Sequence, residues 1–187
     1  MRDEPATAPD LDWNVLITSR EGGQRQLRRA LRPLIRLRRS AFRNVLLGQV
    51  DDIEAFLGAL AERCAQRPAL EHWLGKVLPI ERTFALDPSR FEAQLGDEAA
   101  VFLDRLAGRS FHVRVERRGH KGVIHTHAAE VALGAHLYTA LEARGQPARV
   151  AFADPDVVLA VEVMGRAAGL GLVTRELRQR CAFVKID

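Results

Sequence analysis

The stretch between residues 110 and 137 changes its hydrophobic period from that of a strand to that of a helix, and two glycines separate the two patterns. In Phe111–Glu116 apolar and polar side chains alternate, which is the period of a half-buried strand. A helix is predicted to begin near Thr126, a plausible cap, and to end at Gly145. A strand, a glycine-containing turn and a helix in this order indicate a mixed α/β fold for the second half of the chain.

Further strands are predicted in the same half. Arg149–Ala153 and Val157–Val163 have strand composition and are joined by the turn Asp154–Pro155–Asp156, while Leu170–Val173 and Ala182–Ile186 are shorter candidates. These segments agree with the mixed α/β class.

The first half alternates strands with helices. Its predicted segments, in the order strand, helix, strand, helix, strand, are Trp13–Ser19, Gln24–Arg38, Phe42–Val50, Asp51–Gln66 and Val77–Leu86. Pro33 is expected to kink or shorten the first helix. The order suits a small ferredoxin-like α/β unit. We therefore predict a flexible tail over residues 1–10, a ferredoxin-like domain over residues 11–90 and a second mixed α/β domain over residues 91–187.

The charge composition favours a polyanionic partner. The formal net charge is +4, and 25 arginines stand against three lysines. Arginine makes planar, bidentate contacts to phosphate, as a nucleic-acid surface requires. An organism with GC-rich codons would also favour arginine everywhere, so the placement of the charges must decide.

Nothing in the sequence predicts a membrane segment. No apolar run approaches the roughly 20 residues that cross a bilayer, and the N-terminus has no signal-peptide pattern. Cys64 and Cys181 are isolated and lack metal-type spacing, which is typical of core thiols in a reducing compartment. We expect a cytoplasmic protein without a membrane partner.

A first basic group is predicted on the helix that follows the first strand. At about 100° per residue, six arginines fall within one arc of this helix. They are Arg25, Arg28, Arg29, Arg32, Arg36 and Arg39. A solvated face normally mixes charge signs, whereas no acidic residue occurs between Gln24 and Arg43. The pattern favours phosphate contact, with a plain solvated face as the alternative.

A second basic group surrounds the turn after the strand Phe111–Glu116. Its candidate RNA-binding residues are Arg114, Arg117, Arg118, His120, Lys121 and His125. Glycines allow backbone amides to approach an anion, and the N-terminus of the following helix adds partial positive charge. An exposed basic loop without a ligand is the alternative.

Catalytic and metal-binding patterns are weak. His120, His125 and His127, with Asp154 and Asp156, could be metal ligands, but they have no recognised spacing, and the helical wheel favours packing or capping for His127. No phosphate-binding loop, dinucleotide fingerprint or nucleophile elbow is present. The sequence predicts no enzyme, no metal, no cofactor and no small-molecule substrate.

Several residues of the second half together resemble the THUMP domain of tRNA-modifying enzymes. The matching positions are Phe111, Val113, Arg114, Arg117–Arg118, Glu130, Gly134, Pro155–Asp156 and Val161–Glu162–Val163. The first half resembles the ferredoxin-like domain that usually precedes THUMP, including the P-I-x-x-T-F element at Pro79–Phe84. The likeness is greatest to the THUMPD-type tRNA-binding adaptors, which have both parts.

The resemblance implies a non-catalytic protein that recognises the tRNA acceptor stem and 3′ end. Its expected partners are tRNA and a separate tRNA-modifying enzyme, as the adaptors of the family serve an RNA cytidine acetyltransferase. Two alternatives stay open, namely a protein-interaction subunit without RNA binding and a metal-dependent RNA-processing enzyme that uses the His and Asp cluster.

Overall fold

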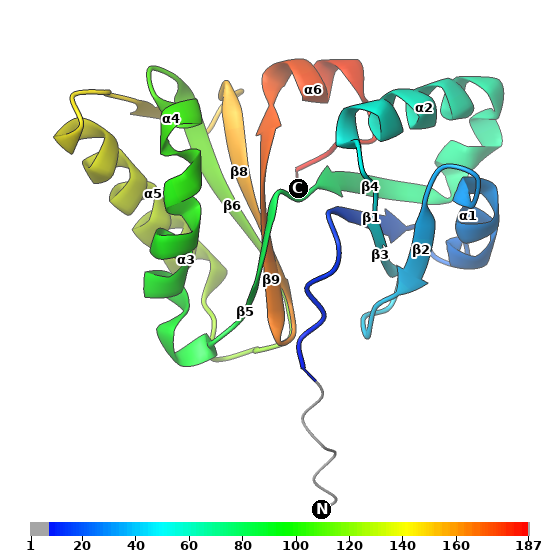
Figure 1. Cartoon of the computed structure of the whole chain (residues 1–187), viewed down its shortest axis with the longest axis horizontal. Helices are drawn as coiled ribbons and strands as arrows, with labels where there is room; N and C mark the ends of the chain where they lie inside the picture. Colours follow the sequence, from blue (N-terminus) through cyan, green and yellow to red (C-terminus); the bar gives the residue numbers. More distant parts are fainter. Residues whose placement is uncertain (1–7, 187) are drawn as a thin grey trace, which may run out of the picture.

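The computed structural model describes residues 8–186 as two β-sheets that lie against each other, each with helices on its outer side (Figure 1). The first sheet has the order β2-β3-β1-β4 and all its pairs are antiparallel. Its strands are β1 (Val15–Ser19), β2 (Arg36–Arg39), β3 (Val45–Gln49) and β4 (Leu74–Pro79). The connecting helices are α1 (Gln24–Leu31) and α2 (Ile53–Gln66). This βαββαβ order confirms the predicted ferredoxin-like unit.

Local signals account for α2. Asp52 caps the helix by accepting a hydrogen bond of 2.9 Å from the Ala55 amide, which satisfies one of the free donors of the first turn. The helix ends just ahead of Pro68, which begins the 3₁₀ turn η1 (Pro68–His72). Proline removes a backbone donor and restricts the residue before it, so the α-helix stops there.

The first helix is shorter than predicted. We expected one helix over Gln24–Arg38, but α1 ends at Leu31, and Arg36–Arg39 form strand β2 at the edge of the sheet. Pro33 is the physical reason, because its ring fixes the backbone and its nitrogen cannot donate the next helical hydrogen bond. The arginines predicted on one helix face therefore belong to two elements.

The predicted strand Val77–Leu86 is two strands in two sheets. β4 ends at Pro79, and β5 (Arg82–Ala85) pairs with the last strand of the second sheet. The chain thus changes sheet near Ile80, whereas the division into domains at residue 90 stays a prediction.

The second sheet has the order β5-β9-β8-β6-β7. Its further strands are β6 (Ser110–Arg118), β7 (Arg149–Val150), β8 (Val157–Met164) and β9 (Ala167–Thr174). β6 pairs parallel to both β7 and β8, and β9 is antiparallel to β5 and β8. The strand predicted at Arg149–Ala153 is shorter than expected, and the one at Leu170–Val173 is longer. The predicted mixed α/β class is confirmed.

Helices cover the outer face of this sheet, on the side away from the ferredoxin-like half (Figure 1). They are α3 (Phe91–Ala99), α4 (Leu103–Leu106) and α5 (Thr126–Ala143), with the 3₁₀ turns η2 (Pro88–Arg90) and η3 (Ala100–Phe102). After β9 the chain forms α6 (Arg175–Arg180) and returns to the first sheet. No helix within residues 8–186 is long and apolar enough to cross a membrane.

The C-terminal segment is not the predicted strand Ala182–Ile186. It is irregular, because the chain turns where the Val184 amide donates to the Cys181 carbonyl at 2.8 Å. One strand-like contact remains, in which the Val77 amide donates to the Phe183 carbonyl at 2.9 Å. The segment therefore fastens the end of the second half to β4.

The two halves are packed closely where β9 meets the first sheet. A Cβ added at Gly169 would lie 2.5 Å from the ring of Trp13, and one added at Gly171 would overlap the Pro79 carbonyl oxygen. The buried core of the first half also includes residues of the second, among them Met164 and Val173. The interface therefore leaves little room for sliding of one half on the other.

Candidate nucleic-acid interface

Six arginines of the ferredoxin-like half line one hollow of about 360 Å³, which we call the arginine hollow. They are Arg25, Arg28, Arg29, Arg32, Arg36 and Arg39. The buried side chains of Ile35 and Leu37 form its apolar floor. The predicted grouping thus exists, although it joins α1, the turn after it and β2 instead of one helix.

No acidic side chain within residues 8–186 pairs with the arginines of the arginine hollow. Within residues 8–186 none of the six guanidinium groups has a hydrogen-bond or ion-pair partner, and all six arginines are exposed. The neighbouring Arg38 on β2, by contrast, donates two hydrogen bonds to Asp10, and Arg43 pairs with Glu21. Six guanidinium groups around one hollow repel each other, and a bound polyanion would relieve that repulsion.

The turn between β6 and α5 has a defined conformation. Gly119 and Gly122 have φ of +94° and +83°, and His120 has φ of +51°, a region that side chains rarely adopt. The His120 Nε2 atom lies 2.7 Å from the Gly165 carbonyl oxygen, and the Ile124 amide donates to the His120 carbonyl at 3.0 Å. These contacts fix the turn and leave Lys121 exposed on it.

The other predicted residues of this turn have different surroundings. Arg114 is exposed, and its Nη1 lies 3.6 Å from Glu130 Oε1. Arg117 donates to the Gly119 carbonyl at 2.8 Å. His125 is the exposed N-cap residue of α5, and its side chain makes no capping bond. Thr126, predicted as the cap, is the first helical residue instead.

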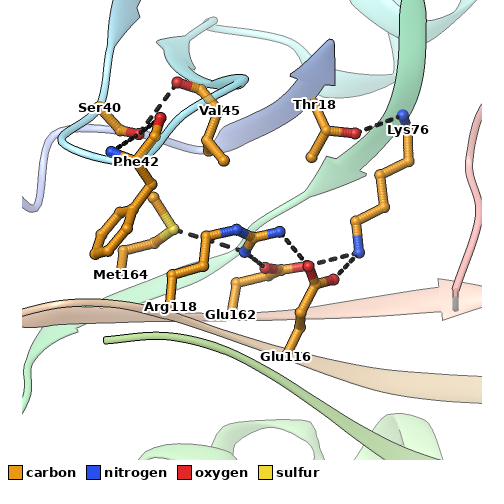
Figure 2. A network of polar contacts seen from close by, with 9 residues as sticks. All are labelled: Thr18, Ser40, Phe42, Val45, Lys76, Glu116, Arg118, Glu162 and Met164. Carbon is orange, nitrogen blue, oxygen red and sulfur yellow. Dashed lines mark hydrogen bonds and ion pairs between the residues drawn. The ribbon is translucent and has the colours of Figure 1, made fainter. Parts of the chain in front are cut away.

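Arg118 belongs to a buried group of charges between the two halves, shown in Figure 2. We call Lys76, Glu116, Arg118 and Glu162 the interdomain ion cluster. Arg118 donates to both carboxylates, and Lys76 pairs with Glu116 and lies 3.2 Å from Glu162 Oε1. Glu162 is 1% exposed and Lys76 is 5% exposed. RNA contact by Arg118 stays a prediction, and its guanidinium already has two anionic partners.

The cluster keeps Lys76 charged. Burial works to lower the pKa of Lys76, but the carboxylates of Glu162 and Glu116 outweigh burial and raise that pKa above its ordinary value. Sequence reasoning missed this group. The available signal was Glu162, a lone acidic residue inside the apolar strand Val157–Met164, because a buried charge requires a partner.

One aromatic residue of the ferredoxin-like half lies close to the β6–α5 turn. Phe42 lies in the loop between β2 and β3, and its ring would be 3.4 Å from a Cβ at Gly165 and 3.8 Å from one at Gly119. Figure 2 shows its ring beside Met164 and Arg118. The loop between β2 and β3 therefore lies close to the start of the basic turn.

The histidines do not assemble a metal centre in the described part of the chain. Among residues 8–186 no three His, Cys, Asp or Glu side chains are placed to hold one ion. Asp156 instead accepts hydrogen bonds from Ser110 and Arg175. His127, predicted to pack or to cap, is 90% exposed in its side chain.

A second hollow, of about 300 Å³, lies between α5 and the edge of the second sheet and was not predicted. It is mostly apolar, and its rim includes Tyr138 and the highly exposed Phe152. The ring of His112 meets Phe152 edge-on at 5.2 Å, and burial lowers the pKa of His112. The available signal in the sequence was that Val131 and Tyr138, seven residues apart, share one face of the helix.

The arrangement defines a class of two-part α/β proteins in which a ferredoxin-like half precedes a half with a five-stranded mixed sheet. No protein-family model and no curated protein matches the sequence. Solved structures do. TrmN from Thermus thermophilus is 22% identical with a TM-score of 0.61, and the match covers 84% of this chain and 44% of that one.

Two other similar structures contain ligands. A 4-thiouridine synthetase in complex with RNA and bound ATP is 16% identical with a TM-score of 0.54, covering 86% of this chain and 41% of that one. SMU.472, a suspected methyltransferase complexed with SAH, is 11% identical with a TM-score of 0.57, covering 89% of this chain and 42% of that one. This chain spans less than half the length of each of these proteins.

These similarities correct the expectation that the protein is not an enzyme. The same fold occurs in TrmN, in a synthetase and in a suspected methyltransferase. The lack of familiar catalytic motifs in the sequence therefore does not separate this chain from enzymes.

Proposed function

We propose that this protein binds tRNA and serves in tRNA modification. One observation carries the proposal, namely the arginine hollow, whose six guanidinium groups have no partner within residues 8–186. Lys121 on the β6–α5 turn and Arg114 on β6 add further exposed positive charge. The 4-thiouridine synthetase of similar fold was solved with RNA, which supports RNA as the polyanion.

The finer part of the proposal concerns what is recognised. We propose that the protein contacts the acceptor stem and 3′ end, and that a tRNA-modifying enzyme is its partner. Phosphate contacts fix position without reading sequence, so binding is expected to differ little among tRNAs. A protein-interaction role without RNA binding would require a protein partner that neutralises the hollow.

The first test uses neighbouring residues of one strand. Arg36→Gln with Arg39→Gln removes two unpaired charges from β2, whereas Arg38→Gln removes the charge that Asp10 already neutralises. Each phosphate contact contributes roughly 0.7 to 0.9 to the slope of log affinity against log salt. The double variant is therefore expected to reduce that slope by about 1.5, and the control by much less. Fluorescence anisotropy with labelled tRNA at several salt concentrations measures both.

A comparison of several ligands tests whether the protein prefers tRNA to other polyanions. Total tRNA, the same tRNA without its 3′ end, and duplex DNA are compared at two salt concentrations. Weaker binding to trimmed tRNA and to DNA is expected. Equal binding of tRNA and DNA would contradict a tRNA-specific role, and an unchanged slope in the double variant would exclude the hollow from the contact surface.

A further inference from the structure

We propose that the interdomain ion cluster fixes the orientation of the arginine hollow relative to the β6–α5 turn, so that one RNA contacts both at the same time. Lys76 is then a positioning residue for RNA binding that touches no RNA itself. The inference rests on the proposed function for its RNA part, and its structural part is tested separately.

The charged residues that the second sheet contributes to the cluster do not neutralise each other completely, and the first sheet supplies the missing positive charge. Glu116 and Glu162 are direct partners across β6 and β8, and Arg118 bridges their carboxylates from the same side. These three residues together carry one net negative charge in a largely buried place. Lys76 comes from β4 in the other sheet and supplies a positive charge to both carboxylates. Docking of the two halves therefore also neutralises the net charge of the cluster.

Neutralisation of this kind depends on geometry. An apolar interface tolerates small shifts, whereas a buried carboxylate left without its partner is strongly disfavoured. Glu162 is 1% exposed in the docked arrangement, so protein cations and not solvent neutralise its carboxylate there. The arrangement that keeps Lys76 between Glu116 and Glu162 is thus favoured over neighbouring arrangements.

The cluster is joined directly to the basic turn. Arg118 immediately precedes Gly119, and its carbonyl accepts a hydrogen bond of 3.0 Å from the Gly165 amide. The Gly165 carbonyl in turn lies 2.7 Å from His120 Nε2. A change in the position of Arg118 is therefore transmitted to the turn that presents Lys121.

Lys76 is held equally firmly in the first sheet. Its amide donates to Thr18 Oγ1 at 2.9 Å, at the place where the register of β1 and β4 shifts between Ile17 and Ser19. Such a bulge redirects side chains locally. From β1 the sheet continues through β3 to β2, which lines the arginine hollow.

The test combines a distance with an affinity. Nitroxide labels on cysteines placed at the exposed positions Ala65 on α2 and Ala143 on α5 report the arrangement of the two halves by pulsed EPR. The unsubstituted cluster is expected to give one narrow distance distribution, and Lys76→Met a broader or shifted one. Because simultaneous contact multiplies affinity, tRNA affinity is expected to fall about 100-fold. Affinity for a short oligonucleotide that reaches only one basic region should change less than about twofold.

Matched variants separate orientation from charge. Lys185→Met removes the same charge at an exposed position and should leave both the distance and the tRNA affinity unchanged. Should Lys76→Met not fold, Glu116→Gln breaks the cluster at its half-exposed carboxylate, and the same shifts are expected. An unchanged distance distribution in a folded cluster variant overturns the proposal, as does an altered distribution with unchanged tRNA affinity. If the unsubstituted protein binds no tRNA, the proposed function fails while the distance measurement still decides the positioning role.

Discussion

Arginine side chains have opposite surroundings in the arginine hollow and in the interdomain ion cluster. The hollow gathers six exposed guanidinium groups that have no acidic partner within residues 8–186. The cluster gathers two cations and two carboxylates, and all but Glu116 are largely buried. The charges of the cluster are paired within the protein, whereas the charges of the hollow are available to bind an anionic ligand. The environment of an arginine, more than its place in a basic run, therefore indicates its role.

The largest expected difference between the two regions is in stability. Glu162→Leu leaves the buried cations with one carboxylate, and removing one partner of a buried ion pair costs about 3 to 5 kcal/mol of unfolding free energy. Arg32→Met in the hollow removes an unpaired exposed charge and is expected to change that free energy by less than about 0.5 kcal/mol. Urea unfolding followed by circular dichroism measures both. Similar losses in the two variants would break the distinction.

Neighbouring residues of the basic turn sharpen the distinction at a smaller scale. Lys121→Gln removes an exposed charge, so it is expected to reduce the salt slope of tRNA binding by about 0.7 to 0.9 without affecting stability. Arg118→Gln is expected to lower the unfolding free energy and tRNA affinity together, because it disturbs the cluster first. Salt titrations and urea unfolding of the same preparations test this pair. If Arg118→Gln leaves the stability unchanged but reduces the salt slope of tRNA binding, Arg118 contacts RNA directly.

Local patterns in the sequence predicted several of the elements but not the pairing between them. The alternation in Phe111–Glu116 and the apolar run Val157–Val163 gave two central strands, since each pattern depends only on near neighbours. The arginine hollow was predicted as one helix face, and Pro33 explains why its residues lie on a helix and a strand instead.

The interdomain ion cluster could not be predicted in the same way. Glu116 and Glu162 meet only through the register of β6 and β8, and Lys76 joins them only because the two sheets dock. Both conditions depend on contacts between segments far apart in the chain. The same limit applies to Arg118, which local sequence groups with Arg117 and which packing separates from it.

Asp156 offers an intermediate case between the two regions, because its carboxylate is fully paired and yet partly exposed. Hydrogen bonds from Ser110 and then from Arg175 lower its pKa from the ordinary 3.8 to about 2. A carboxyl whose pKa is lower in the folded state stabilises the fold above its unfolded value, and this stabilisation is lost as the pH falls from about 4 toward 2. Ser110→Ala removes the hydroxyl donor and should move the pKa of Asp156 back toward 3.8.

That last effect is the smallest of the series, because solvent screens an exposed carboxylate. Carbon-detected NMR titration of Asp156 in the native protein and in Ser110→Ala gives the pKa directly, with Asp104 as an exposed reference that the substitution does not touch. A pKa that stays near 2 in the variant would assign the shift to the Ser110 amide and Arg175. Charge pairing and one backbone hydrogen bond, without burial, would then be sufficient to hold an acid ionised, and the burial of the interdomain ion cluster would have to be explained by orientation and not by ionisation.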